Sequence, residues 1–205
     1  MAKRIITISR EFGSGGRFIG EEVAKKLGIV YYDKSIINEI AEKSGLAPEY
    51  IQENAELSPK KGVFAYALVG RDITGRSVGD MVYEAQRKII LDLAEREPCV
   101  IIGRNADYIL KDTEGIQLVR AFIYAPNDVR IHNIMESHNL SEKDAKLLLD
   151  EKDKRYHKRH LALTGSNRGD RHNRDILINS DFLGIQGTAE YLEDLIAKKY
   201  GKKEA

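Results

Sequence analysis

A glycine-rich turn near the N-terminus has the composition of a phosphate-binding site. The turn reads GSGG at positions 13–16 and is followed directly by an arginine. Such a turn leaves backbone N–H groups free to point at an anion, and a helix that begins there adds the partial positive charge of its N-terminus. We therefore expect the turn and the two residues after it to bind phosphate. These residues are Gly13, Ser14, Gly15, Gly16, Arg17 and Phe18.

Arg104 is a second candidate for anion binding. It follows the apolar run Cys99 to Ile102, with only Gly103 between them. A charge at the edge of a core needs a partner, which is either a structural salt bridge or a bound anion. We favour the anion, because buried strand, glycine and polar groups follow one another here as they do at the glycine-rich turn.

A third candidate is a basic stripe on a long charged helix predicted at about 141–163. Lys152, Arg155 and Arg159 lie three and four residues apart, so they share one face. Pairs such as Glu151–Arg155 explain many of the charges on this helix as a solvated, salt-bridged surface. They do not explain Arg159, because the residue four positions before it is Arg155, a like charge. We favour phosphate binding by the stripe.

These candidates lie in a chain whose predicted strands alternate with helices. Short β-branched runs predict the strands, and apolar residues at helical spacing predict the helices. The predicted strands are 5–8, 29–32, 99–102, 117–124 and 175–179, and the main predicted helices are 19–27, 36–44, 79–97, 126–135, 141–163 and 185–200. This alternation predicts an α/β fold with a mainly parallel sheet and helices on both faces.

Asp33 ends the second predicted strand, just before a helix. The carboxyl ends of parallel strands form ligand sites in α/β proteins. Asp33 is therefore either a helix cap or a substrate contact, and both alternatives have equal support.

The composition narrows the classes of function. The 33 Lys and Arg nearly balance the 32 Asp and Glu, so general adhesion to nucleic acid or membrane is not expected. Cys99 is the only cysteine and no long apolar segment begins the chain, so we expect a cytosolic protein. Residues 57–76 are the least regular and are interpreted as a mobile flap or a homodimer contact. Within them, Arg71 and Arg76 are more consistent with a surface role than with phosphate binding.

Four stretches of the chain match the motifs of a known family in order and spacing. They are 6–28 (ITISREFGSGGRFIGEEVAKKLG), 99–110 (CVIIGRNADYIL), 151–159 (EKDKRYHKR) and 176–185 (ILINSDFLGI). They correspond to an opening strand-loop-helix, a strand ending in Gly-Arg-Asp with Asn105 at the Asp position, an arginine-rich lid, and a closing strand with the start of the last helix. Over nearly its whole length the chain resembles the cytidylate kinase-like family, a branch of the P-loop nucleoside monophosphate kinases.

The resemblance implies a three-layer α/β/α P-loop nucleoside-kinase fold with a five-stranded parallel sheet and a helical lid. It implies a single domain over residues 1–205, with a flap or acceptor region at about 34–78 and the lid at about 139–172. The implied chemistry is transfer of the γ-phosphoryl group of ATP to a nucleoside monophosphate, with a cytidylate-like acceptor and with Mg²⁺ bound through the nucleotide phosphates.

The resemblance also implies roles for the candidate residues. Residues 13–18 would hold the phosphates of the nucleotide donor, and Arg17, Arg155 and Arg159 would act on the transferred group. The acceptor would be bound by Asp33, Arg104, Asn105 and Asp107. No specific nucleic acid and no membrane partner is implied, and no residue is assigned as a metal ligand.

The phosphate loop departs from the family pattern. Gly16 occupies the Lys position, with Arg17 one residue later, Phe18 occupies the position of the Thr or Ser, and Arg10 replaces the first glycine. Arg17 could supply the missing charge, and a metal would then be bound through water or a carboxylate such as Asp33. Two alternatives stay open: nucleotide binding without efficient transfer, and phosphorylation of another small phosphate-bearing acceptor.

Overall fold

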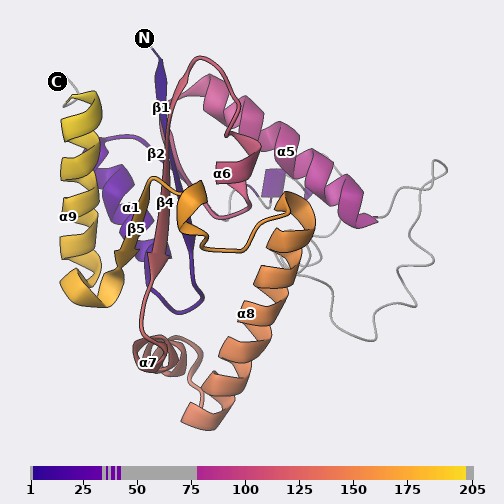
Figure 1. Ribbon diagram of the computed structural model, residues 1–205, viewed down its shortest axis with the longest axis vertical. Coiled ribbons are helices and arrows are strands. Elements are labelled where there is room, and N and C mark those ends of the chain that lie inside the picture. The colour runs from indigo at the N-terminus through magenta and orange to yellow at the C-terminus, as the bar shows by residue number, and fades with distance from the viewer. Residues whose placement is uncertain (1, 34–35, 37, 40, 43–77, 202–205) are drawn as a thin grey trace.

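The structure is a computed structural model that describes residues 2–33, 36, 38–39, 41–42 and 78–201. Five parallel strands form one sheet in the order β2-β3-β1-β4-β5 (Figure 1). The strands are β1 (Lys3–Arg10), β2 (Val30–Tyr32), β3 (Cys99–Ile102), β4 (Ile116–Tyr124) and β5 (Ile176–Asn179). The predicted α/β fold with a five-stranded parallel sheet is confirmed. The irregular segment 57–76, with Arg71 and Arg76, lies outside the described residues.

Helices cover both faces of the sheet and extend beyond its carboxyl edge (Figure 1). They are α1 (Gly16–Leu27), α5 (Val78–Arg96), α6 (Ala106–Ile109), α7 (Asn127–His138), α8 (Glu142–Thr164) and α9 (Ser180–Tyr200), with a short 3₁₀ helix at Arg171–Asn173. Helices α1 and α9 pack on one face of the sheet, and α5 and α6 pack on the other. The three layers agree with the expected architecture.

The central strand β1 is buried on both faces. Ile5 packs into the apolar cluster under α5 and α6, whereas Ile6 and Ile8 pack into the cluster under α1 and α9. Side chains of a strand alternate between faces, so a strand covered on both sides needs a continuous apolar run. In the neighbouring strand β3, burial raises the pKa of the Cys99 thiol to about 12, as expected of a packing residue.

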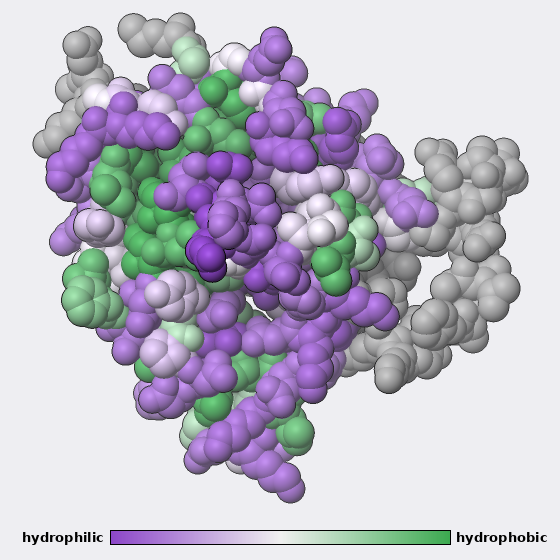
Figure 2. Space-filling view, in the orientation of Figure 1, coloured by the Kyte–Doolittle hydropathy of each residue, from purple (hydrophilic) through white to green (hydrophobic). Residues whose placement is uncertain are grey.

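Helix α8 is long, charged and only partly buried. Its N-cap is Ser141, whose Oγ accepts a hydrogen bond from the Asp144 N–H (3.2 Å), as the Ser-x-x-Asp pattern predicts. The predicted pair Glu151–Arg155 is present at 3.2 Å. In Figure 2 the surface along α8 is mainly hydrophilic. Within the described part of the chain, no helix is long and apolar enough to cross a membrane.

Helix α1 approaches the sheet most closely at Gly20. A β-carbon on Gly20 would overlap Cδ1 of Ile102 and would lie 3.3 Å from Cδ1 of Ile8. Glycine at this position therefore lets the helix lie directly on β1 and β3. The close packing also fixes where the helix begins, which is the position of the glycine-rich turn.

We predict that Gly20→Ala destabilises the protein by about 1–3 kcal/mol, although alanine favours helix formation, because the added methyl group overpacks the interface. The free energy of unfolding in urea measures the effect. Ile102→Val removes the overlapping Cδ1 and by itself costs about 0.5–1.5 kcal/mol. The double variant should lose less than the sum of the single losses. Strictly additive losses would contradict the close contact.

Candidate functional site

The glycine-rich turn connects the carboxyl end of β1 to the start of α1. Gly13 (φ 80°) and Gly15 (φ 74°) have left-handed backbone conformations, which favour glycine. A β-carbon on Gly13 would also lie 2.8 Å from the carbonyl oxygen of Arg130. Helix α1 begins at Gly16, so its first N–H groups have no acceptor inside the helix. The turn therefore has the backbone geometry of an anion site.

Ser14 has a structural role within this turn. Its hydroxyl donates to the carbonyl oxygens of Glu11 (2.9 Å) and Ile123 (3.3 Å), and its own N–H donates to Glu11. The Ser180 hydroxyl donates to the Ser14 carbonyl at 2.7 Å. Ser14 is only 2% exposed. These bonds hold the turn in shape and engage the hydroxyl with the backbone.

One cavity of about 730 Å³, here called the site cavity, brings the turn together with several charged side chains. The predicted site residues that line it are Gly13, Gly15, Gly16, Arg17, Phe18, Asp33 and Arg104. Arg10 and Arg168 line it as well, so four arginines line the cavity together with the carboxylates of Glu11, Asp33 and Glu136. The volume is in the range of small-molecule sites, and guanidinium groups favour phosphate or carboxylate ligands.

Arg17 and Asp33 form an ion pair at the rim of this cavity. Nε of Arg17 lies 2.9 Å from Oδ2 of Asp33, and the two side chains are 45% and 10% exposed. The pair connects the start of α1 to the end of β2. Water reaches the pair from the Arg17 side only, because the Asp33 carboxylate is largely buried. An incoming anion can therefore reach the Arg17 guanidinium from solvent.

Arg104 lies on an unusual stretch of backbone. Gly103, Arg104 and Asn105 all have positive φ angles, of 64°, 59° and 52°. The left-handed conformation is unfavourable for the two non-glycine residues. The Arg104 carbonyl accepts a hydrogen bond from Nε2 of the fully buried Gln86 at 2.7 Å. The side chain of Arg104, only 5% exposed, is thereby held at the carboxyl end of β3.

Asn105 and Asp107 contact other parts of the protein. Oδ1 of Asn105 lies 2.8 Å from Nδ1 of His160, which belongs to α8. Asp107 forms a buried ion pair with Arg174 (2.5 Å) and accepts a hydrogen bond from the Ser9 hydroxyl (3.2 Å). These contacts join the end of β3 to α8 and to the segment before β5. Both residues support the wall of the site.

The structure does not bring Arg155 and Arg159 to the site cavity. Arg155 pairs with Glu151 on its own helix. Arg159 donates to the Gly79 carbonyl at the start of α5 (3.3 Å), and burial lowers the pKa of its guanidinium. Neither side chain is among the residues that line the cavity. The like-charge contact expected between them is thus relieved by protein partners.

Arg130 is a buried residue beside the site that sequence reasoning missed. It is 2% exposed, and its Nη2 donates to both carboxylate oxygens of Asp153 on α8 at 2.8 Å. Its Nε donates to the Phe12 carbonyl at 2.7 Å, and Nη1 lies 3.5 Å from the Glu11 carboxylate. The only available signal was a basic residue four positions before the buried Ile134 on α7. Arg130 connects the glycine-rich turn to α8.

Arg168 and Tyr156 were also missed. The guanidinium of Arg168 lies over the Tyr156 ring, 4.4 Å from its centroid, and donates to the Arg10 carbonyl. The polar stretch from Thr164 to Asn173 predicted only a loop. The stacking fixes Arg168 beside the end of β1, where it lines the site cavity.

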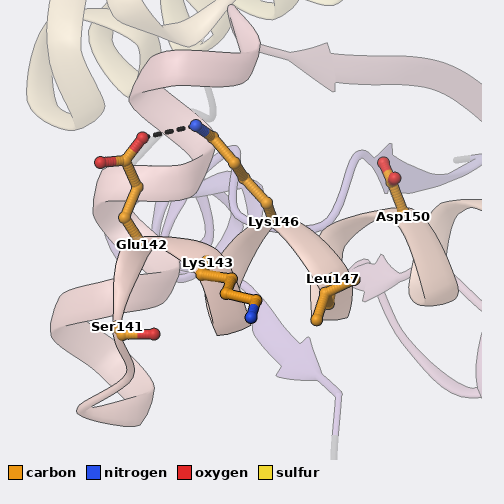
Figure 3. A pocket seen from close by; sticks show the side chains of 6 residues that line it. All are labelled: Ser141, Glu142, Lys143, Lys146, Leu147 and Asp150. Carbon is orange, nitrogen blue, oxygen red and sulfur yellow. Dashed lines mark hydrogen bonds and ion pairs between the residues drawn. The ribbon is translucent and has the colours of Figure 1, made fainter.

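A second hollow, of about 640 Å³, lies along the first turns of α8 (Figure 3). It is lined by Ser141, Glu142, Lys143, Lys146, Leu147 and Asp150. All six belong to one helix and its cap, and Lys146 pairs with Glu142 at 2.5 Å. The hollow collects none of the predicted site residues. The site cavity is the better candidate.

Comparison with known proteins agrees with this geometry. The sequence profile of the cytidylate kinase-like family matches residues 5–182. The chain belongs to this family. A cytidylate kinase of Thermoplasma volcanium is 27% identical over 87% of this chain and 83% of its own length. A cytidylate kinase of Pyrococcus horikoshii is 25% identical over 90% and 84%.

Solved structures share the fold. An uncharacterized protein from Eubacterium ventriosum has a TM-score of 0.67 at 25% identity, covering 98% of this chain and all of the other. Shikimate kinase from Bacteroides thetaiotaomicron has a TM-score of 0.54 at 15% identity, covering 96% and 99%. The second likeness concerns the fold alone. The cytidylate kinase-like chain described here therefore has the fold of P-loop kinases.

We predict that Arg130→Ala destabilises the protein by about 2–3 kcal/mol, because the Phe12 carbonyl and two carboxylates lose a buried donor. Arg130→Lys should recover only part of the loss, since a single ammonium cannot reproduce the two-pronged contact. Denaturant unfolding measures both variants. The matched control is Arg120→Ala, whose pair with Asp175 is about 30% exposed on each side and should cost less than about 1 kcal/mol. Equal losses in Arg130→Ala and Arg120→Ala would contradict the central role of Arg130.

We predict that His160 makes the protein acid-sensitive. Burial lowers the pKa of His160 to about 4, nearby Arg174 and Arg168 lower it further, and Asp107 opposes the shift. The folded-state pKa lies below the unfolded value of 6.5, so the unfolded chain binds more protons between these pH values. Stability should then fall by up to about 3 kcal/mol as pH drops from 6.5 to 4.

Urea unfolding at several pH values checks this acid slope. His160→Gln should flatten it, whereas His132→Gln, at an exposed histidine, should keep it. An unchanged slope in His160→Gln would show that other groups cause the acid sensitivity.

Proposed function

We propose that the protein transfers the γ-phosphoryl group of ATP to a nucleoside monophosphate, with a cytidylate-like acceptor. The observation that carries the proposal is the site cavity, where the glycine-rich turn, Arg17, Asp33 and Arg104 meet at the carboxyl edge of a parallel sheet. Phosphoryl transfer depends on positioning and on neutralising negative charge, and this cavity offers both. Family membership and the curated relatives named cytidylate kinase support the same activity.

The proposed roles follow from the positions of the residues. The backbone N–H groups of Gly15 to Phe18 hold the donor phosphates, and Arg17 leaves Asp33 to contact the transferred group. Asp33 and Arg104 orient the acceptor. Asn105 and Asp107 keep the acceptor wall in place through His160 and Arg174.

Residues 139–172 are proposed to act as a lid within a single domain. Arg155 and Arg159 contact protein groups in the present arrangement. In the proposed mechanism α8 moves toward the site cavity, and the two arginines close over the transferred group. The acceptor region at about 34–78 lies largely outside the described residues, and a homodimer contact there remains a prediction.

The chain offers a poor set of direct ligands for Mg²⁺. In the described ranges, no group of three or more His, Cys, Asp or Glu side chains is arranged to hold a metal. The Ser14 hydroxyl donates to backbone carbonyls, and Asp33 is paired with Arg17. In the proposal Mg²⁺ therefore enters with the donor phosphates, and we assign it no step.

The test is a kinase assay of the purified protein with ATP, Mg²⁺ and a panel of nucleoside monophosphates, with ³¹P NMR identification of the product. A diphosphate should form, most readily from a cytidylate-like acceptor. Arg17→Ala should lower kcat/KM by about 10²-fold, because it removes a charge aimed at the transferred group. Arg120→Ala, at the partly exposed pair with Asp175, should retain activity.

Two outcomes would favour the alternatives. Nucleotide binding with no diphosphate product from any acceptor would identify a nucleotide-binding protein without transfer. Product only from phosphate-bearing acceptors that lack a base would identify a kinase of another small molecule. The missing lysine at position 16 is the specific reason to keep the first alternative.

A further inference from the structure

Gly16 has no room for a side chain. A β-carbon added there would lie 2.6 Å from the β-carbon of Arg10 and 3.1 Å from that of Ile123. Both obstacles are β-carbons, which move only with the backbone of β1 and β4. A side chain at position 16 is therefore incompatible with the side chain at position 10.

This contact relates two departures from the usual phosphate loop. In the pattern G-x-x-x-x-G-K-[ST], position 10 is the first glycine and position 16 is the lysine. Here the side chain is at position 10 and the glycine is at position 16. A cation, Arg10, therefore lies at the end of β1, and Gly16 leaves the space that its side chain needs.

Arg10 belongs to a group of arginines that line two neighbouring spaces. Arg10, Arg104 and Arg168 line both the site cavity and a small inner hollow beside it. Arg174 also lines the inner hollow and is neutralised by Asp107. Among the described residues that line the inner hollow there is no carboxylate. Three arginines therefore line both spaces, whereas the carboxylates of the site cavity, Glu11, Asp33 and Glu136, do not line the inner hollow.

Two of these arginines are fixed by the protein. Arg168 is stacked on Tyr156 and bonded to the Arg10 carbonyl. Arg104 is 5% exposed and sits on the left-handed backbone that Gln86 holds. Guanidinium groups held in this way suit a doubly charged phosphate, to which each can donate two hydrogen bonds.

We propose that Arg10, Arg104 and Arg168 form a phosphate subsite at the carboxyl ends of β1 and β3, in which Arg10 provides the charge that a lysine at position 16 would provide. The ligand is a phosphate dianion, either the terminal phosphate of the donor or the phosphate of the acceptor. Its use in catalysis rests on the proposed function, whereas anion binding does not.

The first test measures binding of inorganic phosphate by calorimetry. Arg10→Ala should weaken binding by about tenfold or more, because one charge-assisted contact is lost. The matched control is Arg4→Ala, at the other end of β1, where the side chain donates to the Tyr200 carbonyl. Arg4→Ala should bind inorganic phosphate as tightly as the wild type does. Equal affinity in Arg10→Ala and wild type, or no binding by the wild type, would overturn the subsite.

The second test exchanges the two positions. Gly16→Lys should lower the melting temperature, and Arg10→Gly/Gly16→Lys should regain stability and phosphate binding. Arg10→Gly/Gly16→Ala should regain stability without phosphate binding. The proposal would be refuted if Gly16→Lys were as stable as the wild type. It would also be refuted if Arg10→Gly/Gly16→Lys were no more stable than Gly16→Lys alone.

Competition distinguishes the two sources of phosphate. Displacement of bound phosphate by a non-hydrolysable ATP analogue, but not by CMP, identifies the donor, and the reverse identifies the acceptor. Displacement by neither would reject a role for the subsite in the proposed reaction. Loss of phosphate binding in Arg10→Ala with an inactive wild type leaves the subsite standing and rejects the kinase. Unchanged phosphate binding in Arg10→Ala, together with kinase activity of the wild type, would reject the subsite and leave the proposed kinase function standing.

Discussion

The buried guanidinium of Arg130 is the contact on which the arrangement of the site depends. A charge in a protein interior requires a full set of partners. Arg130 finds them in the Phe12 carbonyl before the glycine-rich turn and in the Asp153 carboxylate on α8. Because one planar group bonds to both, it connects the turn to the middle of α8.

The ion pairs of the site differ in burial. This difference separates a pair that stabilises the wall of the site from a pair that a ligand can reach. The Asp107–Arg174 pair has both side chains 3% exposed, so its attraction acts in a low dielectric and it holds the wall. In the Arg17–Asp33 pair the Arg17 side chain is 45% exposed, so water screens the pair from that side although Asp33 is buried. A ligand can therefore reach Arg17 more readily than Arg174. The degree of burial therefore determines which of these arginines a substrate can contact.

The strands were predictable because a strand that is covered on both faces of a parallel sheet has a continuous apolar sequence, as β1 and β3 do. The cap at Ser141 was equally local. The contacts that shape the site were not predictable, because they join residues far apart in sequence, such as Arg130 with Asp153. The contact of Gly16 with Arg10 spans only six residues, yet it depends on the three-dimensional path of the turn. Composition indicated phosphate binding there, but it could not show which cation occupies the space.

The backbone from Gly103 to Asn105 has a consequence for ligand binding. The left-handed conformations of Arg104 and Asn105 are unfavourable on their own, and Gln86 and His160 hold these residues in place through hydrogen bonds. The conformational entropy of Arg104 is therefore lost when the chain folds and not when a ligand arrives. An anion that meets this arginine finds a group that is already oriented, so more of the contact energy appears as affinity. The backbone strain at Arg104 and Asn105 is thus accepted during folding and favours tighter binding of the anion.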